Sequence, residues 1–304
     1  MPAPTALPPT ALPLVPRVWA AAQLGAGSRV VRVRRLRGAS ASVVHAVDVD
    51  DRAAQCHRLV LRRFVGPIAL TEPDLAAREA GVLTHLRGRG TGAPELLGVD
   101  ADGSVAGDPA VLASRVPGRI DLEPGDLRRW LRELSSALEP IHALDGHGLP
   151  RYGRYDGGHW SGPPPWSQQP AAWERAAEIV DRGPVTRPHV LIHRDYHPLN
   201  TLWSRGRLTG VVDWASACIG DPGVDIGHCR VNLAMLFGRN VADAFAPDAD
   251  PYWDLSSATD GVAWSLPTSS FRDAGRTDLD DRVVAERLDD FVADAVSRVA
   301  RAAP

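Results

Sequence analysis

Three short stretches of the sequence decide the fold: VLIHRDYHPLN (residues 190–200), LTGVVDW (208–214) and GDPGVDIG (220–227). In the first, an apolar run leads into a polar loop that carries Asp195 and, five positions later, Asn200. Asp213 comes thirteen positions after Asn200 and directly follows a second apolar run. A carboxylate and an amide on one loop, with a second carboxylate after the next strands, form the pattern His-x-Asp-x4-Asn…Asp.

Phosphoryl transfer needs residues of this kind. A carboxylate has to orient the attacking hydroxyl and accept its proton, and oxygen ligands have to hold the magnesium ion that bridges the nucleotide phosphates. A carboxylate and an amide five residues apart can supply the base and one ligand, and Asp213 can supply the other ligand. The spacing therefore predicts an enzyme that moves a phosphoryl group.

Together the three stretches resemble the catalytic core of the aminoglycoside phosphotransferase family, the antibiotic and small-molecule kinases with a protein-kinase-like fold. They match its pattern His-x-Asp-x-His-Pro-x-Asn, then Asp-Trp, then Gly-Asp-Pro-x-x-Asp. The resemblance implies an α+β, bilobal protein-kinase-like fold, whose N-lobe is an antiparallel sheet plus one helix and whose C-lobe is mainly helical. It also implies Asp195 as the catalytic base, Asn200 and Asp213 as ligands of Mg2+, and ATP or GTP as the phosphate donor.

The resemblance assigns supporting roles to three further residues. We expect the ring of His193 to hold the loop by hydrogen bonds, and Asp225 to brace the loop from the following helix. His197 stands where protein kinases usually carry lysine and the small-molecule branch often carries histidine. The family usually has glycine before the asparagine, and Leu199 stands there instead. This departure concerns the local geometry of the loop and not the role of Asn200.

The chain contains no lysine, because all 34 Lys and Arg side chains among its 304 residues are arginine. Schiff-base chemistry and a lysine-bearing phosphate loop are therefore excluded. In the related kinases a lysine on the third strand holds the nucleotide phosphates. Alternation along that strand puts Val60 and Arg62 on one face, so we expect Val60 to cover the adenine and Arg62 to reach the phosphates. Glu79, on the following helix, is the expected ion-pair partner of Arg62.

Other residues are candidates for nucleotide binding because of where they fall between the expected strands and lobes. Gly38, Ser40 and Ser42 belong to a patch of small residues between the first two expected strands, where a phosphate-covering loop would lie. Small residues let backbone N–H groups approach phosphates, although such a patch is also typical of an ordinary turn. Ser114 falls where the two lobes would join and where backbone groups would pair with the purine edge.

Hydrophobic periodicity predicts the organisation of the chain. The expected strands are at residues 30–36, 42–49, 58–64, 95–99, 110–115, 190–192, 202–203 and 208–212. The expected helices are at residues 72–88, 125–144, 171–182, 224–237 and 283–302. We therefore expect a proline-rich N-terminal arm over 1–27, a nucleotide-binding N-lobe over 28–115, and a catalytic and substrate-binding C-lobe over 116–304.

Composition narrows the setting. A formal net charge of −3 argues against a nucleic-acid-binding face. The three cysteines form no C-x-x-C pair, which favours a reducing compartment over a disulfide framework. No run of about 18 apolar residues is present, so we expect no membrane span and a cytoplasmic protein; the oligomeric state is left open. Cys218, Cys229 and His228 are expected to be buried packing residues.

The leading hypothesis is a phosphotransferase that moves the γ-phosphate of ATP or GTP to a hydroxyl of a small-molecule acceptor, with an antibiotic (aminoglycoside or macrolide-like) as the first choice. Acidic side chains after residue 155 would suit a cationic acceptor, and the aromatic ones an apolar acceptor. The alternatives are a kinase of a metabolic small molecule (a sugar, amino alcohol or secondary metabolite) and a nucleotide-binding pseudokinase. A protein kinase fits less well, because Asp221 follows Asp213 by only eight positions.

Overall fold

The computed structural model describes residues 11–36, 42–66, 70–155, 157–184, 188–260 and 266–302. The chain divides into two compact units. The N-terminal unit comprises Met1–Pro117 together with Asp213–Ala215, and the C-terminal unit comprises Gly118–Val212 and Ser216–Pro304. The three residues that begin at Asp213 thus belong to the N-terminal unit, although the sequence around them belongs to the other.

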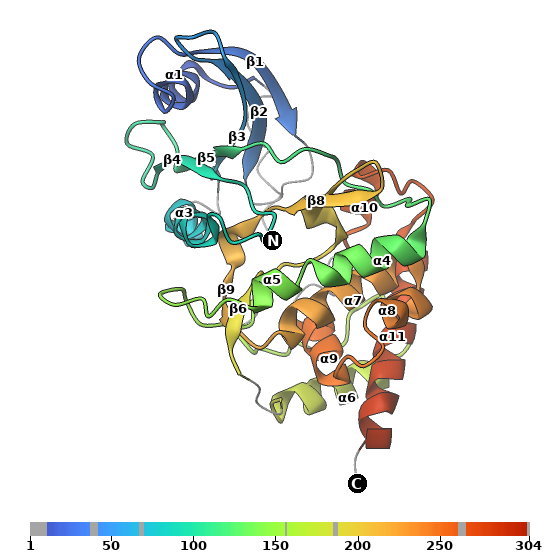
Figure 1. Cartoon of the computed structure of the whole chain (residues 1–304). Coiled ribbons are helices and arrows are strands. Elements are labelled where there is room, and N and C mark those ends of the chain that lie inside the picture. The colour runs from blue at the N-terminus through green and yellow to red at the C-terminus, as the bar shows by residue number, and fades with distance from the viewer. Residues whose placement is uncertain are drawn as a thin grey trace. The chain divides into compact units, whose positions relative to one another are not determined.

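The N-terminal unit is built on a five-stranded antiparallel sheet in the order β1-β2-β3-β5-β4 (Figure 1). Its strands are β1 (Arg29–Leu36), β2 (Val43–Asp50), β3 (Cys56–Arg63), β4 (Leu96–Asp100) and β5 (Ala110–Ser114). The edge strand β1 carries arginines at positions 29, 32, 34 and 35. A charged edge strand discourages pairing with another chain.

Helix α1 (Leu14–Ala22) contributes to the core of this unit. Its Trp19 and Ala20 are buried together with Leu59 and Leu61 of β3. The segment expected to be a proline-rich arm therefore contains a packed helix. The prolines suggested an irregular segment, but they lie where a helix tolerates them. Pro13 precedes the helix and Pro16 lies in its first turn, where a backbone N–H would make no hydrogen bond within the helix.

Helix α3 (Leu75–Leu86) packs against β4 and β5, as the apolar stripe predicts. Its buried positions include Ala76, Leu83 and, among these apolar neighbours, the carboxylate-bearing Glu79. A carboxylate on the buried face of a helix requires a partner, because an isolated charge is costly to remove from water.

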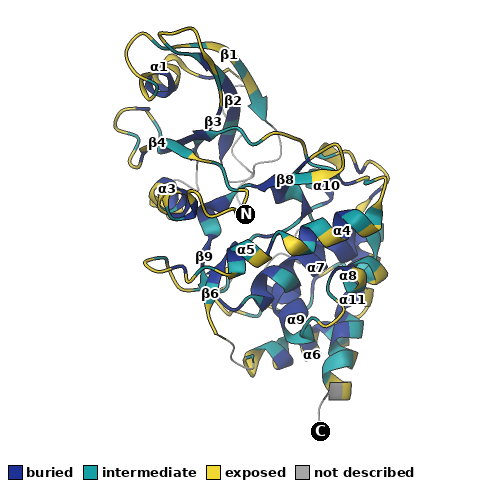
Figure 2. Ribbon diagram, viewed as in Figure 1, coloured by how far each residue is buried: buried dark blue, intermediate teal, exposed yellow. Residues whose placement is uncertain are grey.

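The C-terminal unit is mainly helical, and its helices are α4 (Leu127–Ser136), α5 (Glu139–His142), α6 (Pro170–Asp181), α7 (Gly223–Phe237), α8 (Arg239–Phe245), α9 (Pro251–Thr259), α10 (Thr268–Asp273) and α11 (Asp281–Ala302). Helix α7 is buried along most of its length and packs against α8, α9 and α11 (Figure 2). The single helix expected over 125–144 is divided into α4 and α5, because Pro140 in the first turn of α5 cannot donate a backbone hydrogen bond.

Four short strands complete this unit. They are β6 (Val190–Ile192), β7 (Thr201–Ser204), β8 (Arg207–Val211) and β9 (Cys218–Gly220). Strands β7 and β8 form the expected hairpin, and β6 pairs antiparallel with β9. Strand β9 was not predicted because, unlike the equally short Val190–Ile192, it has only one β-branched residue and ends in glycine. A 3-10 turn, η1 (Pro198–Asn200), joins the loop after β6 to β7.

A buried ionic network joins the helices around α7. The Arg230 side chain is fully buried, and its Nε and Nη2 donate to Asp254 Oδ1 and Asp243 Oδ1, both at 2.8 Å. Arg298 Nη1 also donates to Asp254, at 3.2 Å. Because each buried charge has an opposite partner, the network can persist in the interior. Two of the carboxylates expected to attract a cationic acceptor are thus engaged within the fold.

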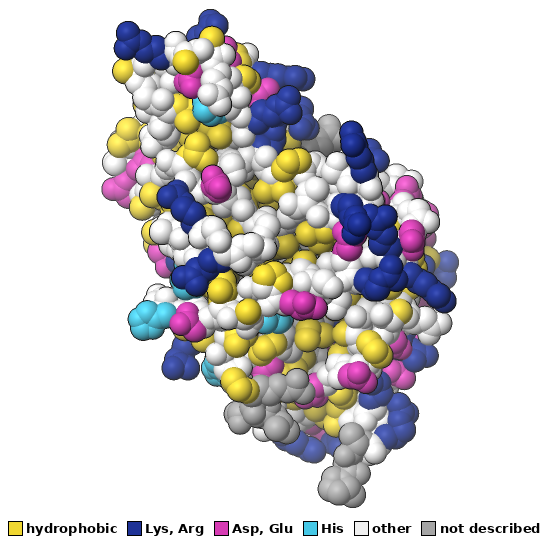
Figure 3. Space-filling model, in the orientation of Figure 1, with side chains coloured by type: hydrophobic (Ala, Val, Ile, Leu, Met, Phe, Trp, Pro, Cys, Tyr) yellow, Lys and Arg dark blue, Asp and Glu magenta, His cyan; other side chains and the backbone are white. Residues whose placement is uncertain are grey.

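No helix in the described ranges is long and apolar enough to cross a membrane. Every dark blue side chain in Figure 3 is an arginine, because the chain has no lysine. On the face shown, these arginines lie in separate groups with acidic side chains between them.

The crossing of α7 and α9 depends on Gly227. A Cβ placed there would lie 2.3 Å from the carbonyl oxygen of Trp253, which is backbone and cannot rotate away. Overpacking of this kind costs about 1–3 kcal/mol, and sometimes more. We expect Gly227→Ala to lower the free energy of unfolding by at least that amount, measured by chemical denaturation.

A matched control is Gly81→Ala, which adds the same methyl group to helix α3 at a position with no neighbouring atom within 4 Å. This variant is expected to be neutral or stabilised by about 0.5–1 kcal/mol, since alanine is the better helix former. Equal destabilisation of both variants would contradict the close approach at Gly227.

Candidate active site

In the N-terminal unit, Arg62 joins two carboxylates. It lies on β3, where Leu59 and Leu61 face the core and Arg62 faces the other way. Its Nη1 donates to Glu79 Oε1 at 3.0 Å and to Asp213 Oδ1 at 2.6 Å. Both contacts lie within one compact unit, and the Arg62–Glu79 pair is the one expected from the sequence.

The electrostatics of this cluster follow from burial. Loss of water lowers the pKa of Arg62, but the charges of Asp213 and Glu79 outweigh it, so the pKa is raised and Arg62 stays charged. Burial raises the pKa of Glu79, and the charge of Arg62 opposes this rise. Asp213 has a φ of +69°, in the left-handed region that residues other than glycine seldom adopt. Such backbone strain is typical of functional positions.

The other nucleotide-binding candidates differ in what they contact. The Ser42 hydroxyl is buried and accepts a hydrogen bond from Arg62 Nε at 2.9 Å, so it helps to orient the guanidinium. Val60 lies opposite Ala113 of β5 in the sheet. The Ser114 hydroxyl accepts from the backbone N–H of Glu95 at 2.9 Å and so joins β5 to the segment before β4. Gly38 and Ser40 lie outside the described residues.

In the C-terminal unit, Asp225 fixes the loop that carries Asp195. Its fully buried carboxylate accepts backbone hydrogen bonds from His193 N at 2.9 Å and Arg194 N at 2.7 Å. His142 Nε2, on α5, donates to the same carboxylate at 2.9 Å. The bracing contact expected for Asp225 is thus present, and His142 is a partner that the sequence did not reveal.

The ring of His193 connects this loop to the strand before Asp213. The ring is buried, and its Nε2 donates to the carbonyl oxygen of Val212 at 3.0 Å. The backbone N–H of Val212 in turn donates to the carbonyl oxygen of Asn200 at 2.9 Å. The residue before Asp213 is therefore held from both sides, as a structural role of His193 predicts.

Asp195 is surrounded by three polar side chains of its own unit. Asn200 Nδ2 donates to Asp195 Oδ2 and to the Asp195 carbonyl oxygen, both at 2.9 Å. Nε2 of His228 and Nε2 of His197 lie 3.2 and 3.5 Å from Asp195 Oδ1. Burial raises the pKa of Asp195, but the charge of His197 and the hydrogen bonds from His197 and His228 outweigh it and hold the pKa well below its usual value. The side chain remains 32% exposed, so the ionised carboxylate can still be reached.

The sequence did not place His228 beside Asp195. It was expected to be a packing residue, and it is buried, but its ring lies next to that of His197 with the centroids 5.5 Å apart. A usable signal was present, because His228 follows Asp225 by three positions on α7 and residues three apart share a helix face. A brace at Asp225 therefore directs His228 toward the same loop.

The residues proposed to bind magnesium have suitable donor atoms. The amide nitrogen of Asn200 faces two acceptors of Asp195, which leaves its amide oxygen as the atom that can bind a metal. The Asp213 carboxylate is 34% exposed. Carboxylate and amide oxygens are the ligands that Mg2+ prefers, so the donor set fits this ion.

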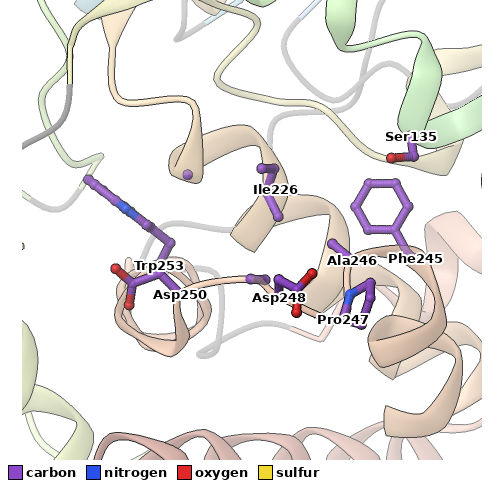
Figure 4. A pocket seen from close by; sticks show the side chains of 10 residues that line it. Ser135, Ile226, Phe245, Ala246, Pro247, Asp248, Asp250 and Trp253 are labelled. Carbon is purple, nitrogen blue, oxygen red and sulfur yellow. The ribbon is translucent and has the colours of Figure 1, made fainter. Parts of the chain in front are cut away.

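A separate cavity of about 280 Å³ lies among α4, α7, α9 and the segment that follows α8. Figure 4 shows Trp253 at one end and Phe245 with Ser135 at the other. Asp248 and Asp250 line it, and Asp250 also caps α9 by accepting from Tyr252 N at 3.0 Å. Pockets for drug-sized ligands usually measure about 300–1,000 Å³, so this cavity alone is too small for a large antibiotic.

Comparison with known proteins decides the family. The profile of the phosphotransferase enzyme family (APH) matches residues 32–264, about three-quarters of the chain. The chain belongs to this phosphotransferase family. The match includes both clusters described above, and it confirms the resemblance inferred from the sequence motifs.

Solved structures of this phosphotransferase family share the fold. The aminoglycoside phosphotransferase APH(4)-Ia, in a ternary complex with ADP and hygromycin B, has a TM-score of 0.61 at 17% identity, over 91% of this chain and 97% of that one. The GDP complex of aminoglycoside 2'-phosphotransferase-IIIa has a TM-score of 0.55 at 17% identity, over 93% and 98%. The kinase-like fold class predicted from the sequence is therefore confirmed.

Among curated proteins, this phosphotransferase is similar to homoserine kinase of Sinorhizobium fredii (strain NBRC 101917 / NGR234). The identity is 30% over 166 residues. The match covers 49% of this chain, and the chain spans only about half (49%) of that relative's length.

We predict that Asp225→Asn loosens the loop around Asp195. The amide keeps the shape but removes the negative charge that accepts from His193 N, Arg194 N and His142. Hydrogen bonds to charged groups contribute about 1.5–3 kcal/mol, against about 1 for neutral ones. We expect about 1–3 kcal/mol lower unfolding free energy and faster amide hydrogen exchange at His193 and Arg194.

The control is Asp121→Asn, the same substitution at a position in the same unit. The Asp121 carboxylate accepts only one exposed hydrogen bond, from the backbone N–H of Glu123. It should unfold like the wild type. If the amides of residues 193 and 194 exchange at unchanged rates in Asp225→Asn, the carboxylate does not hold the loop.

Proposed function

We propose that this protein transfers the γ-phosphate of ATP or GTP to a hydroxyl of a small molecule, with Asp195 as the general base. One observation carries the proposal. The Asp195 carboxylate is ionised and accessible, and its loop is anchored by a buried carboxylate. A base that must accept a proton from a bound hydroxyl needs both accessibility and a fixed position.

In the proposed reaction, the acceptor hydroxyl oxygen attacks the γ-phosphorus. The bond from that phosphorus to the β–γ bridging oxygen breaks as the new P–O bond forms, and nucleoside diphosphate leaves. The hydroxyl proton passes to an Asp195 carboxylate oxygen. Asn200 fixes this carboxylate through Oδ2. Asn200 and Asp213 are the residues that would hold Mg2+, and the ion would neutralise phosphate charge there.

On the nucleotide side, Arg62 is proposed to hold phosphate oxygens in place of the usual lysine. Its guanidinium already neutralises two carboxylates and is oriented by Ser42. A planar guanidinium offers several N–H donors in a fixed geometry, which suits phosphate oxygens. Val60 covers the base, and the backbone near Ser114 pairs with its edge. One solved structure with this fold contains ADP and another contains GDP, so both ATP and GTP are to be tested as donors.

The acceptor is proposed to be an antibiotic, on the grounds that a structure with this fold binds hygromycin B. A small amino alcohol is the second candidate, because the curated relative is a homoserine kinase. The three cysteines are free thiols, as is typical of proteins in a reducing compartment, so the enzyme is proposed to be cytoplasmic. A panel of aminoglycosides, macrolides, homoserine and other amino alcohols, screened for acceptor-dependent nucleoside diphosphate release, separates the two classes. Nucleotide binding without release on any acceptor would instead indicate a pseudokinase.

We predict that Asp195→Asn abolishes measurable turnover while nucleotide affinity stays nearly unchanged. Loss of a general base usually costs about 100- to 10,000-fold in rate. The measurements are kcat by coupled nucleotide consumption and the nucleotide Kd by calorimetry. Asp145→Asn, at an exposed position of the same unit, is the control and should keep full activity. Turnover equal to the wild type in Asp195→Asn would exclude Asp195 as the base.

A second prediction concerns the positive charge of Arg62, which is proposed to hold the phosphates. Arg62→Ala should raise the nucleotide KM or lower kcat substantially, because it removes the cation that joins Glu79 and Asp213. Arg62→Lys should retain much of the activity, since an ammonium restores the charge but loses the contact to Ser42. The exposed Arg205 on the β7–β8 turn gives a control, Arg205→Ala. Wild-type kinetics of Arg62→Ala would mean that another residue holds the phosphates.

A further inference from the structure

Three side chains around the proposed base form a set of potential transition-metal ligands. Within the described parts of the chain, one group of His, Cys, Asp or Glu side chains brings three ligand atoms within 4.8 Å of one another. It consists of Asp195, His197 and His228. All three belong to the C-terminal unit, and none is one of the residues proposed to bind magnesium.

The distances suit a zinc-like ion. Zinc bonds to imidazole nitrogen and carboxylate oxygen measure about 2.0–2.2 Å, so neighbouring ligand atoms of a tetrahedral site lie about 3.3–3.5 Å apart. Asp195 Oδ1 lies 3.2 Å from His228 Nε2 and 3.5 Å from His197 Nε2. Two of the three edges thus lie at or close to the required length. The third, between the two imidazoles, is at most 4.8 Å.

Ligand type separates this group from the magnesium ligands. Two imidazoles and one carboxylate suit Zn2+ and its first-row neighbours, whereas Mg2+ selects oxygen ligands. Three protein ligands also leave a coordination position for water or a substrate oxygen.

The ligands are held in place by the fold. His228 is buried on α7, about one helical turn after Asp225. Asp225 also anchors the loop that carries Asp195. His197 Nδ1, in contrast, is buried without a hydrogen-bond partner among the described residues. Metal-bound histidines usually donate their second N–H, and loss of that bond costs about 10- to 100-fold in affinity. The site is therefore expected to exchange its ion rather than hold it permanently.

We propose that Asp195, His197 and His228 form an exchangeable site for Zn2+-class ions, and that its occupation inhibits the enzyme. The inhibition rests on the proposed function, because it follows from Asp195 being the base. A carboxylate oxygen bound to a metal ion cannot accept the proton of an acceptor hydroxyl. The binding itself depends only on the three side chains.

Calorimetric titration of the whole chain with ZnCl2, without nucleotide or magnesium, tests the binding. We expect one Zn2+ per chain. His228→Asn and His197→Asn should each weaken binding at least about tenfold, since each removes a ligand. The control is His147→Asn, at an exposed histidine outside the cluster, which should bind like the wild type. Melting temperatures show that the variants remain folded.

Failure to bind Zn2+, or equal affinity in the wild type and His228→Asn, would overturn the site. The inhibition is tested separately by turnover at fixed Mg-nucleotide excess with increasing Zn2+. The inhibitory concentration should rise in His228→Asn by the same factor as the Kd, and a chelator should restore wild-type turnover. Equal inhibition of both proteins would overturn the inhibitory role. If no acceptor is ever phosphorylated, calorimetry still decides the metal site, so the two failures are distinct.

Discussion

The Asp225 carboxylate is the constraint on which the loop that carries Asp195 depends. A fully buried negative charge must be matched by donors, and its donors are two consecutive backbone N–H groups of the loop and one imidazole. A peptide backbone that must direct two successive N–H groups to one carboxylate has little remaining freedom. The adjoining Arg194 accordingly has a φ of +69°, in the left-handed region. From this anchor follow the position of Asp195 and that of the His193 ring, which fixes the strand end before Asp213.

Arg62 plays the corresponding part in the N-terminal unit. Its Nη1 contacts two carboxylates, that of Glu79 on α3 and that of Asp213, which is far away in the sequence. The segment Asp213–Ala215 accordingly clusters with the sheet and not with its neighbours in the chain. An ion pair between elements distant in sequence thus helps to determine which unit a short segment joins.

The sequence predicted the long elements well, and short-range irregularities poorly. Strand alternation put Arg62 on the face away from the core residues Leu59 and Leu61, because a period of two is visible over eight residues. The Asp225 brace followed from the family resemblance. The sequence could not reveal β9, whose three residues include one β-branched side chain and end in glycine, or α1, where prolines at the helix start resembled an irregular arm. His142 was missed because its partner is 83 positions away and no local pattern records the contact. The position of His228, three residues after Asp225 on one helix, was a signal that went unused.

The absence of lysine has a consequence for how the protein can be modified and controlled. A kinase that holds phosphates with an ammonium can be silenced by acetylation of that lysine, or by amine-reactive nucleotide analogues. An arginine offers neither route, and its guanidinium does not lose its proton at any pH a protein survives. With Arg62 in this position, the charge next to Glu79 and Asp213 is permanent. Covalent probes directed at Arg62 would therefore need a reagent for guanidinium groups rather than for amines.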